Sequence, residues 1–293
     1  MLHRSNLPAF NLAVSTLLKN PSHFLPNLTV STFLDLPEKL GPHLHPTEQQ
    51  QRPRQTGSAN SSSSVSSLSS DSKTKISTVT NNFNHHPTIR ALVLDKDNTL
   101  CPPGTTDFPR AYLRKLESLR TSPTSPFNLT SNPHAVLIVS NSAGSRPESA
   151  RYEAEAQHLE KFLAPLRISV FRVRVPRGGG RTRRKPFCDK EVLTWFQERG
   201  VVQRADEIAV IGDRLATDVL LAARMGAWSI WCKYGVTSLI DSRHNDDDDD
   251  NNNNNNNHID HRTFLGKMET ILERYLRENR GLKTPFPEGW ATK

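Results

Sequence analysis

The chain has 293 residues, which is enough for one or two domains. Only 35% of them are hydrophobic and the mean hydropathy is -0.59, so part of the chain lacks the apolar content of a packed domain. The formal net charge of +8 favours anionic partners, and three widely spaced cysteines give neither a zinc motif nor a disulfide framework, which favours a reducing, intracellular site.

Residues 1–48 are predicted to form a targeting or membrane-associated segment. They contain no acidic residue before Asp35, and a helix would place four apolar side chains on one face: Phe10, Val14, Leu17 and Leu18. An amphipathic, basic and acid-poor stretch is typical of a mitochondrial targeting or membrane-surface segment. The alternative is a packed N-terminal extension of the following domain. No apolar run in the sequence is long enough to span a bilayer.

Two segments of low complexity are predicted to lie outside any packed core. Residues 49–86 are mostly rich in Ser, Gln and Asn and poor in aromatic residues, so we interpret them as a disordered linker. Residues 241–261 include the run "DDDDDNNNNNNN". Adjacent aspartates without a glycine turn do not have the geometry of a calcium loop, so this segment is predicted to be a solvated insert.

The intervening residues, 87–240, alternate apolar runs with helical periodicity. The predicted strands are 89–95, 135–140, 168–175, 207–213 and 227–232, and the predicted helices are 108–120, 146–163, 189–200 and 217–226. This alternation predicts an α/β domain with a three-layer, mostly parallel Rossmann-like sheet, in which the third strand lies nearer an edge. Residues 262–293 are predicted to add an amphipathic helix, which packs back on the domain, and a tail.

Polar residues follow four of the predicted strands at the point where each strand ends. They are Asp95 and Asp97, then Ser140 and Asn141, then Lys185, and finally Asp213 and Asp218. Because ligands bind outside the carboxyl ends of parallel strands, we expect these side chains to meet at one edge of the sheet. Each residue alone has an ordinary structural explanation, such as a turn, a helix cap or a solvated charge. The interpretation depends on their order and placement.

The expected set has a coherent chemistry for phosphate monoesters. Asp95 and Asp213 offer hard oxygen ligands to Mg²⁺, and the ion would offset the repulsion between crowded carboxylates. One carboxylate can attack phosphorus to form an aspartyl phosphate, and a second can act as general acid and base. A serine hydroxyl and a lysine ammonium can hold the phosphoryl oxygens as charge redistributes.

Four stretches, "VLDKDNTL", "LIVSNS", "RKP" and "IGDRLATDV", resemble the motifs of the haloacid dehalogenase superfamily of aspartate-nucleophile phosphatases. The resemblance implies that Asp95 is the nucleophile and that Asp97 is the general acid/base, whose backbone carbonyl binds Mg²⁺. It also implies that Asp213 completes the metal site with Asp218 in support, and that Lys185 steadies the phosphoryl group. We assign Ser140, Asn141 and Thr99 to substrate binding.

A narrower resemblance is to the mitochondrial phosphatidylglycerophosphatase family of fungi and plants. It depends on Lys96 between the two acids, on "VSNSAG", on "GDRLATDV" followed by "MGAWSIWCKYGV", and on the N-terminal "NPSHFLPNLTVSTFLDLP". The resemblance implies removal of the terminal phosphate of phosphatidylglycerophosphate to give phosphatidylglycerol for cardiolipin synthesis. It also implies Mg²⁺ dependence and a peripheral location at the matrix face of the inner membrane. The linker and the Asp/Asn insert depart from the family pattern.

The rest of the sequence agrees with a lipid substrate. No further domain separates the motifs, so the site is expected to be capless or minimally capped, and several arginines precede Lys185, where they would attract an anionic phospholipid surface. Nucleic acid is not expected as a partner, because no aromatic residues are interleaved with the basic ones. Two alternatives stay open: a phosphatase of a soluble phosphomonoester or phosphoprotein, and a catalytically silent membrane or protein interaction module. The presence of both Asp95 and Asp97 counts against the silent module.

Overall fold

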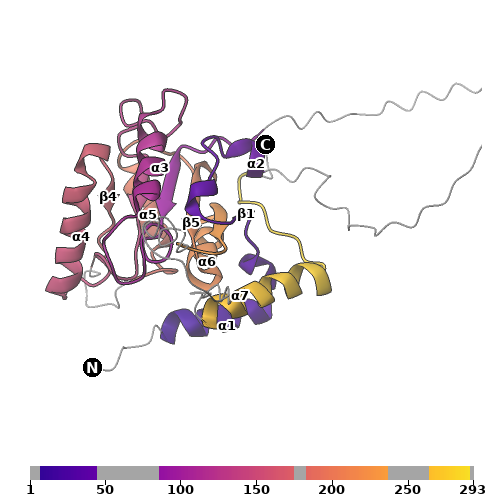
Figure 1. The fold of residues 1–293 in the computed structure, drawn as a ribbon. Helices are drawn as coiled ribbons and strands as arrows, with labels where there is room; N and C mark the ends of the chain where they lie inside the picture. The colour runs from indigo at the N-terminus through magenta and orange to yellow at the C-terminus, as the bar shows by residue number, and fades with distance from the viewer. Residues whose placement is uncertain (1–6, 45–85, 175–182, 237–263, 291–293) are drawn as a thin grey trace, which may run out of the picture.

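The computed structural model describes residues 7–44, 86–174, 183–236 and 264–290 (Figure 1). Three predictions therefore concern residues outside the described ones. These are the linker, apart from its last residue, the Asp/Asn insert, and most of the arginine-rich loop, residues 175–182.

A six-stranded parallel sheet forms the centre of the fold, in the order β1-β6-β5-β2-β3-β4. The strands are β1 (Leu28–Val30), β2 (Ala91–Leu94), β3 (Val136–Ile138), β4 (Ser169–Val170), β5 (Ile208–Gly212) and β6 (Trp228–Cys232). The prediction of a parallel α/β sheet is confirmed, as is the edge position of the strand near residue 170. That strand is much shorter than the predicted 168–175.

Helices cover both faces of the sheet. The helices are α3 (Arg110–Thr121), α4 (Ala150–Phe162), α5 (Asp189–Gln197) and α6 (Leu220–Met225). Along β2, Leu92 and Leu94 point to the face that packs on α3 and α4, whereas Ala91 and Val93 point to the face that packs on α5 and α6. A strand that is covered on both faces must be apolar at every position, which explains the uninterrupted hydrophobic run before Asp95.

The N-terminal segment contributes a strand that the sequence did not predict. Residues 7–44 form α1 (Leu7–Lys19), two 3₁₀ turns, η1 (Pro21–Phe24) and η2 (Phe33–Asp35), the strand β1, and the short helix α2 (Gly41–Leu44). β1 pairs with β6 through Leu28 opposite Ile230 and Val30 opposite Cys232. The sheet therefore extends beyond the predicted domain limits of 87–240. A strand of three residues offers too little alternation to be recognised in a sequence.

The two ends of the described chain lie together on the domain. The C-terminal helix α7 (Phe264–Arg274) continues into the π-turn η8 (Tyr275–Asn279), and both follow the expected amphipathic stretch. Leu272 and Leu276 from this end and Leu12 and Leu17 from α1 pack in one hydrophobic cluster around Trp231. Figure 1 places α1 and α7 along the same lower edge of the molecule. None of the described helices is both long and apolar enough to cross a bilayer.

The topology places a crevice at the centre of the sheet. From β2 the chain continues outward to β3 and β4 on one side, whereas β5 and β6 lie on the other side. β2 and β5 are neighbours, with Leu94 opposite Ile211, and the backbone N–H of Asp95 donates to the carbonyl of Ile211 at 2.9 Å. Such a switch point is where parallel α/β sheets bind their ligands. Asp95 and Asp213 follow these two strands.

Candidate active site

Three carboxylates meet at the switch point between β2 and β5. Asp95 follows β2, Asp213 follows β5, and Asp218 lies on the π-turn η6 (Leu215–Val219) that precedes α6. Each contributes an oxygen to a group whose atoms all lie within 4.8 Å of one another. The structure therefore brings together three of the acids that the sequence analysis selected.

Gly212 permits the close approach of Asp218 to the end of β5. A Cβ atom at Gly212 would lie 2.3 Å from Cγ of Asp218, which is far inside van der Waals contact. The backbone N–H of Arg214 also donates to Oδ2 of Asp218 at 3.2 Å. Glycine here is required by space, because its φ is not in the left-handed region.

Lys185 provides the positive charge inside this acidic group. Its side chain is 2% exposed, and Nζ donates to Oδ1 of Asp95 at 2.5 Å and to Oδ1 of Asp218 at 2.6 Å. Burial alone would lower the pKa of Lys185, but the carboxylates of Asp218 and Asp95 raise it above its ordinary value. The ammonium therefore stays charged and holds Asp95 in a fixed orientation.

The single positive charge of Lys185 does not balance the three clustered carboxylates. Burial, with a contribution from Asp218, raises the pKa of Asp95 to about 7 although Lys185 opposes the shift. Burial and the charges of Asp95 and Asp218 raise the pKa of Asp213 well above its ordinary value. Oδ1 of Asp213 is buried and has no hydrogen-bond partner among the described residues. An orphaned carboxylate oxygen among crowded acids fits a hard divalent cation such as Mg²⁺.

Asn98 orients the other oxygen of Asp213. Its Nδ2 donates to Oδ2 of Asp213 at 2.9 Å, and its backbone has a positive φ of 61°. The carbonyl of Asn98 accepts from the backbone N–H of Val236 at 2.9 Å, so the loop after β6 supports this turn. Asparagine tolerates the left-handed conformation better than most residues, which suits a tight turn beside Asp213.

Asp97 lies apart from the three clustered acids in a network of donors. Its carboxylate accepts from Nζ of Lys96 at 2.6 Å, the backbone N–H of Gly104 at 2.8 Å, and the hydroxyls of Ser142 at 2.6 Å and Ser140 at 3.3 Å. Burial alone would raise the pKa of Asp97, but the charge of Lys96 and these donors lower it. Ser140 is thus placed beside the predicted general acid/base.

Lys96 is completely buried and bridges two carboxylates. Besides Asp97, its Nζ lies 2.9 Å from Oε1 of Glu155 on α4 and donates to the carbonyl of Thr105 at 2.7 Å. The ammonium therefore ties α4 to both ends of the connection that follows β2. A charged pair taken out of water needs such additional partners.

A cavity of about 360 Å³ opens onto the site. Its walls include Asp95, Asp97, Asn141 and Lys185 from the predicted set, together with residues from both ends of the described chain: Ala9, Phe10, Ala13 and Glu269. Thr99, which was assigned to substrate binding, is fully buried and is not among the residues that line this cavity. No inserted domain lies between β2 and β6 in the described residues, in agreement with a capless or minimally capped site.

Several residues of this site were not among the predicted site residues. Asn98 and Ser142 are adjacent to motif positions, so their spacing alone would have identified them as candidates. Glu155 and Glu269 come from helices outside the four motifs, and only the three-dimensional structure brings them to the site.

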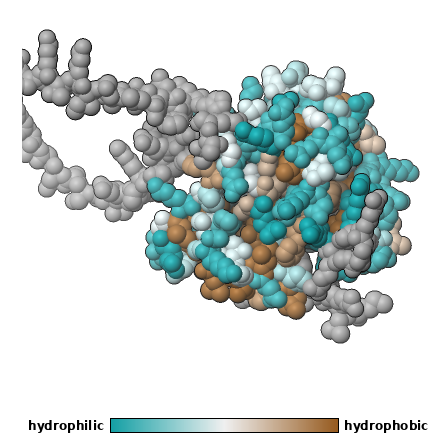
Figure 2. All heavy atoms as spheres, turned by 180° about the vertical axis from the view of Figure 1, so that it is seen from behind, coloured by the Kyte–Doolittle hydropathy of each residue, from teal (hydrophilic) through white to brown (hydrophobic). Residues whose placement is uncertain are grey.

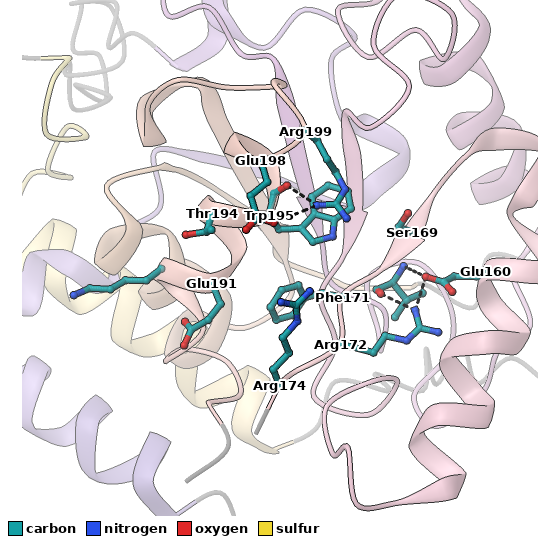
Figure 3. Close-up of a pocket in the computed structure, with 12 residues that line it drawn as sticks. Glu160, Ser169, Phe171, Arg172, Arg174, Glu191, Thr194, Trp195, Glu198 and Arg199 are labelled. Carbon is teal, nitrogen blue, oxygen red and sulfur yellow. Dashed lines mark hydrogen bonds and ion pairs between the residues drawn. The ribbon is translucent and has the colours of Figure 1, made fainter. Parts of the chain in front are cut away.

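A larger cavity, of about 480 Å³, lies elsewhere, beside the edge strand β4 (Figure 3). Two of its arginines contact other residues of its wall: Arg172 pairs with Glu160, and Cζ of Arg199 lies 4.0 Å from the ring centre of Trp195. It contains none of the predicted site residues. The smaller cavity at the switch point is therefore the candidate active site.

Comparison with known proteins agrees with this geometry. A family model described as mitochondrial PGP phosphatase matches residues 7–237. The chain is 33% identical over 151 residues to phosphatidylglycerophosphatase GEP4, mitochondrial, of Saccharomyces cerevisiae, which is 52% of this chain and 70% of the relative. It is 34% identical over 148 residues to a protein of Schizosaccharomyces pombe named "Probable phosphatidylglycerophosphatase, mitochondrial", which is 50% of this chain and 61% of the relative. Among solved structures, none gives a significant match. The matched residues include α1, β1 and all four motifs, and the chain belongs to the mitochondrial PGP phosphatase family.

Proposed function

We propose that this protein hydrolyses the terminal phosphate monoester of phosphatidylglycerophosphate and releases phosphatidylglycerol. The observation that carries the proposal is the cluster of Asp95, Asp213 and Asp218 around Lys185, beside a cavity lined by Asp95 and Lys185, in a chain of this family. The names of the two relatives support the same substrate.

Asp95 is the proposed nucleophile. Oδ1 is engaged by Lys185, which leaves Oδ2 to attack phosphorus and form an aspartyl phosphate. Lys185 holds the carboxylate in position and offers positive charge to the phosphoryl oxygens. Asp95 and Asp213 would hold Mg²⁺, which supplies further positive charge to those oxygens when it is bound.

Asp97 is the proposed proton-transfer group. Its donors fix its orientation at the wall of the cavity that also contains Asp95. A lowered pKa favours the ionised carboxylate, which suits the second half of the reaction, where Asp97 takes a proton from the water that attacks the aspartyl phosphate. In the first half, the same group would deliver a proton to the leaving oxygen.

The proposed location is the matrix face of the mitochondrial inner membrane, with peripheral association. The relatives carry the word "mitochondrial" in their names, and the substrate is a membrane lipid with an anionic headgroup. The described residues contain no large cap, which leaves the cavity open to a substrate whose acyl chains stay in a bilayer.

The test is phosphate release from phosphatidylglycerophosphate in detergent micelles, with and without Mg²⁺, compared with soluble phosphomonoesters. Asp95→Asn should abolish turnover and keep the fold, because the amide is isosteric but cannot attack phosphorus. Asp107→Asn is the matched control, since this exposed aspartate lies in the same connection and outside the carboxylate cluster.

Each outcome bears on a different part of the proposal. Full activity of Asp95→Asn would show that the nucleophile assignment is wrong. Much faster cleavage of soluble esters than of the lipid would refute the substrate and favour a soluble phosphomonoester. Equal rates of phosphate release in Mg²⁺ and in chelator would show that the reaction does not need the metal.

A further inference from the structure

We propose that α1 and α7 together form a surface that docks on an anionic lipid bilayer, so that the active-site cavity opens at the membrane. This inference rests on the proposed function and identifies the part of the molecule that contacts the lipid phase. The α1–α7 surface is defined by seven solvent-exposed side chains: Leu7, Phe10, Val14, Leu18, Met268, Ile271 and Tyr275.

α1 has two apolar faces, and only one of them is needed for packing. Leu12, Ala13 and Leu17 pack against the hydrophobic cluster beneath the helix. On the other side, Leu7, Phe10, Val14 and Leu18 recur at intervals of three and four residues and therefore form a continuous stripe. Phe10 is 65% exposed and Leu18 is 80% exposed. A helix that packed only on this domain would carry polar residues along that stripe.

α7 and the start of η8 repeat this arrangement. Leu272 and Leu276 pack inward, whereas Met268, Ile271 and Tyr275 are exposed at the same three- and four-residue spacing. Figure 2 shows apolar side chains gathered along the lower edge of the molecule, which is the edge where Figure 1 places both helices. Large apolar side chains that gather on one face usually mark an interaction site.

The α1–α7 surface is continuous with the active-site cavity. Phe10 belongs both to the exposed stripe and to the cavity wall, and α7 contributes Glu269 to the same wall. The catalytic Asp95 and Lys185 line the cavity that these helices border. A phospholipid whose acyl chains remain in a bilayer beneath these helices would therefore have a route for its headgroup to Asp95.

The charge around the apolar stripes selects an anionic bilayer. α1 contains no acidic residue and ends at the exposed Lys19. α7 exposes Lys267 and Arg274, whereas Glu269 is buried. Arg214, whose side chain is 42% exposed, lines the cavity. Apolar stripes with basic neighbours are the features of helices that lie in the interface of a membrane and are attracted by anionic lipids.

The test is co-sedimentation of the full chain with vesicles of phosphatidylcholine alone and of phosphatidylcholine mixed with phosphatidylglycerol. The parent should bind the mixed vesicles more strongly, and high salt should weaken that binding. The variant Leu18→Ser/Ile271→Ser removes one exposed side chain from each helix, and neither residue lines the cavity. Its affinity for mixed vesicles should fall roughly tenfold or more. Phe162→Ser, which changes an exposed aromatic residue at the end of α4, should bind as the parent does.

Two activity assays separate docking from catalysis. The Leu18→Ser/Ile271→Ser variant should hydrolyse a soluble phosphomonoester at the parental rate but lose turnover of phosphatidylglycerophosphate in vesicles. Parental binding to vesicles by this variant would overturn the docking surface, and a changed oligomeric state in light scattering would then assign these stripes to contact between copies. Hydrolysis of the lipid in micelles without vesicle binding by the parent would refute docking and leave the proposed function intact. Vesicle binding by the parent without hydrolysis of the lipid would refute the proposed function and leave the docking surface intact.

Discussion

At the scale of single residues, Lys96 is the least expected part of the site. A lysine between the two proposed catalytic acids, Asp95 and Asp97, has no obvious use in a sequence, but the structure gives it one. It forms ion pairs with both Asp97 and Glu155 and connects the loop after β2 to α4. Because all three groups are partly or wholly buried, removal of the ammonium leaves two carboxylates without their main counter-charge.

Lys96→Met should therefore lower the free energy of unfolding by roughly 3–5 kcal/mol and reduce turnover, because Asp97 loses its orientation and its lowered pKa. Urea denaturation and steady-state kinetics measure the two effects. Lys115→Met, a partly exposed lysine on α3, is the matched control and should change both only slightly. Adding Glu155→Met to Lys96→Met should recover part of the stability and none of the activity. Parental stability of the single variant would contradict the ion-pair argument.

A second prediction at this scale concerns the protonation of Glu269 and its effect on stability. Burial raises the pKa of Glu269 from its ordinary 4.5 to about 7, although the backbone N–H of Ala216 donates to it. The folded protein therefore holds a proton that the unfolded chain releases between these two pH values. Stability is lost as the pH rises through this range, and the cost is fully present above about pH 7.

Glu269→Gln keeps the acceptor for Ala216 and cannot ionise. It should be more stable than the parent above about pH 7, on the order of 2–3 kcal/mol, and equal to it below about pH 4.5. Thermal unfolding across this pH range, in chelator, measures the difference. Glu278→Gln, at an exposed position of η8, is the matched surface control. A constant difference between Glu269→Gln and the parent at all pH values would show that the residue does not titrate in this range.

At the scale of elements, the turn after β5 shows how tightly the acids are placed. Asp218 reaches Lys185 only because Gly212 has no side chain. In Gly212→Ala, the added Cβ must displace Asp218, which should cost about 1–3 kcal/mol of stability and lower kcat by roughly tenfold to a hundredfold.

The double variant Gly212→Ala/Asp218→Ala separates the two effects of that change. It removes the atoms that clash and should regain stability, but it should stay poorly active because Lys185 has lost a partner. Thermal unfolding and kcat are the measurements. Full activity of Gly212→Ala would mean that the position of Asp218 is not critical.

The elements also show which parts of the fold can be predicted from a sequence. The positions along the chain of the strands near residues 91, 136, 170, 208 and 228 follow from apolar runs, and the placement of Asp95 and Asp213 follows from the rule that strand ends gather at one edge. The pairing of Lys96 with Glu155 spans distant segments and leaves no periodic pattern. The assignment of Thr99 to the substrate depended on its position beside a motif, but the left-handed turn at Asn98 brings Asn98 to the cavity wall and leaves Thr99 buried.

At the scale of the whole molecule, the N-terminal segment belongs to the fold as well as to any targeting role. The amphipathic pattern of Phe10, Val14, Leu17 and Leu18 led to the prediction of a targeting or membrane-associated segment. Phe10, Val14 and Leu18 are exposed, but Leu17 does not share their face, because it packs against the hydrophobic cluster beneath α1. The same segment buries Phe24, Leu25 and Phe33 and adds β1 to the sheet. A hydrophobic pattern identifies which residues avoid water, but it cannot distinguish a protein core from a membrane surface.

The last prediction follows from this double role. Deletion of residues 1–37 removes β1 and leaves β6 as an edge strand, with its apolar row from Trp228 to Cys232 beside the gap. Three fully buried side chains, Phe24, Leu25 and Phe33, each contribute about 1.5–3 kcal/mol, which together approach the typical stability of a domain, about 5–15 kcal/mol. We therefore expect the truncated chain to unfold or aggregate, as measured by thermal unfolding and size-exclusion chromatography.

As a control, deletion of residues 1–6 should keep the parental melting temperature. A monomeric truncated chain that unfolds at the parental temperature would show that β1 is dispensable. For this reason, membrane binding is better tested by substitutions on the exposed stripe of α1 than by truncation, because the substitutions leave the buried face and β1 in place.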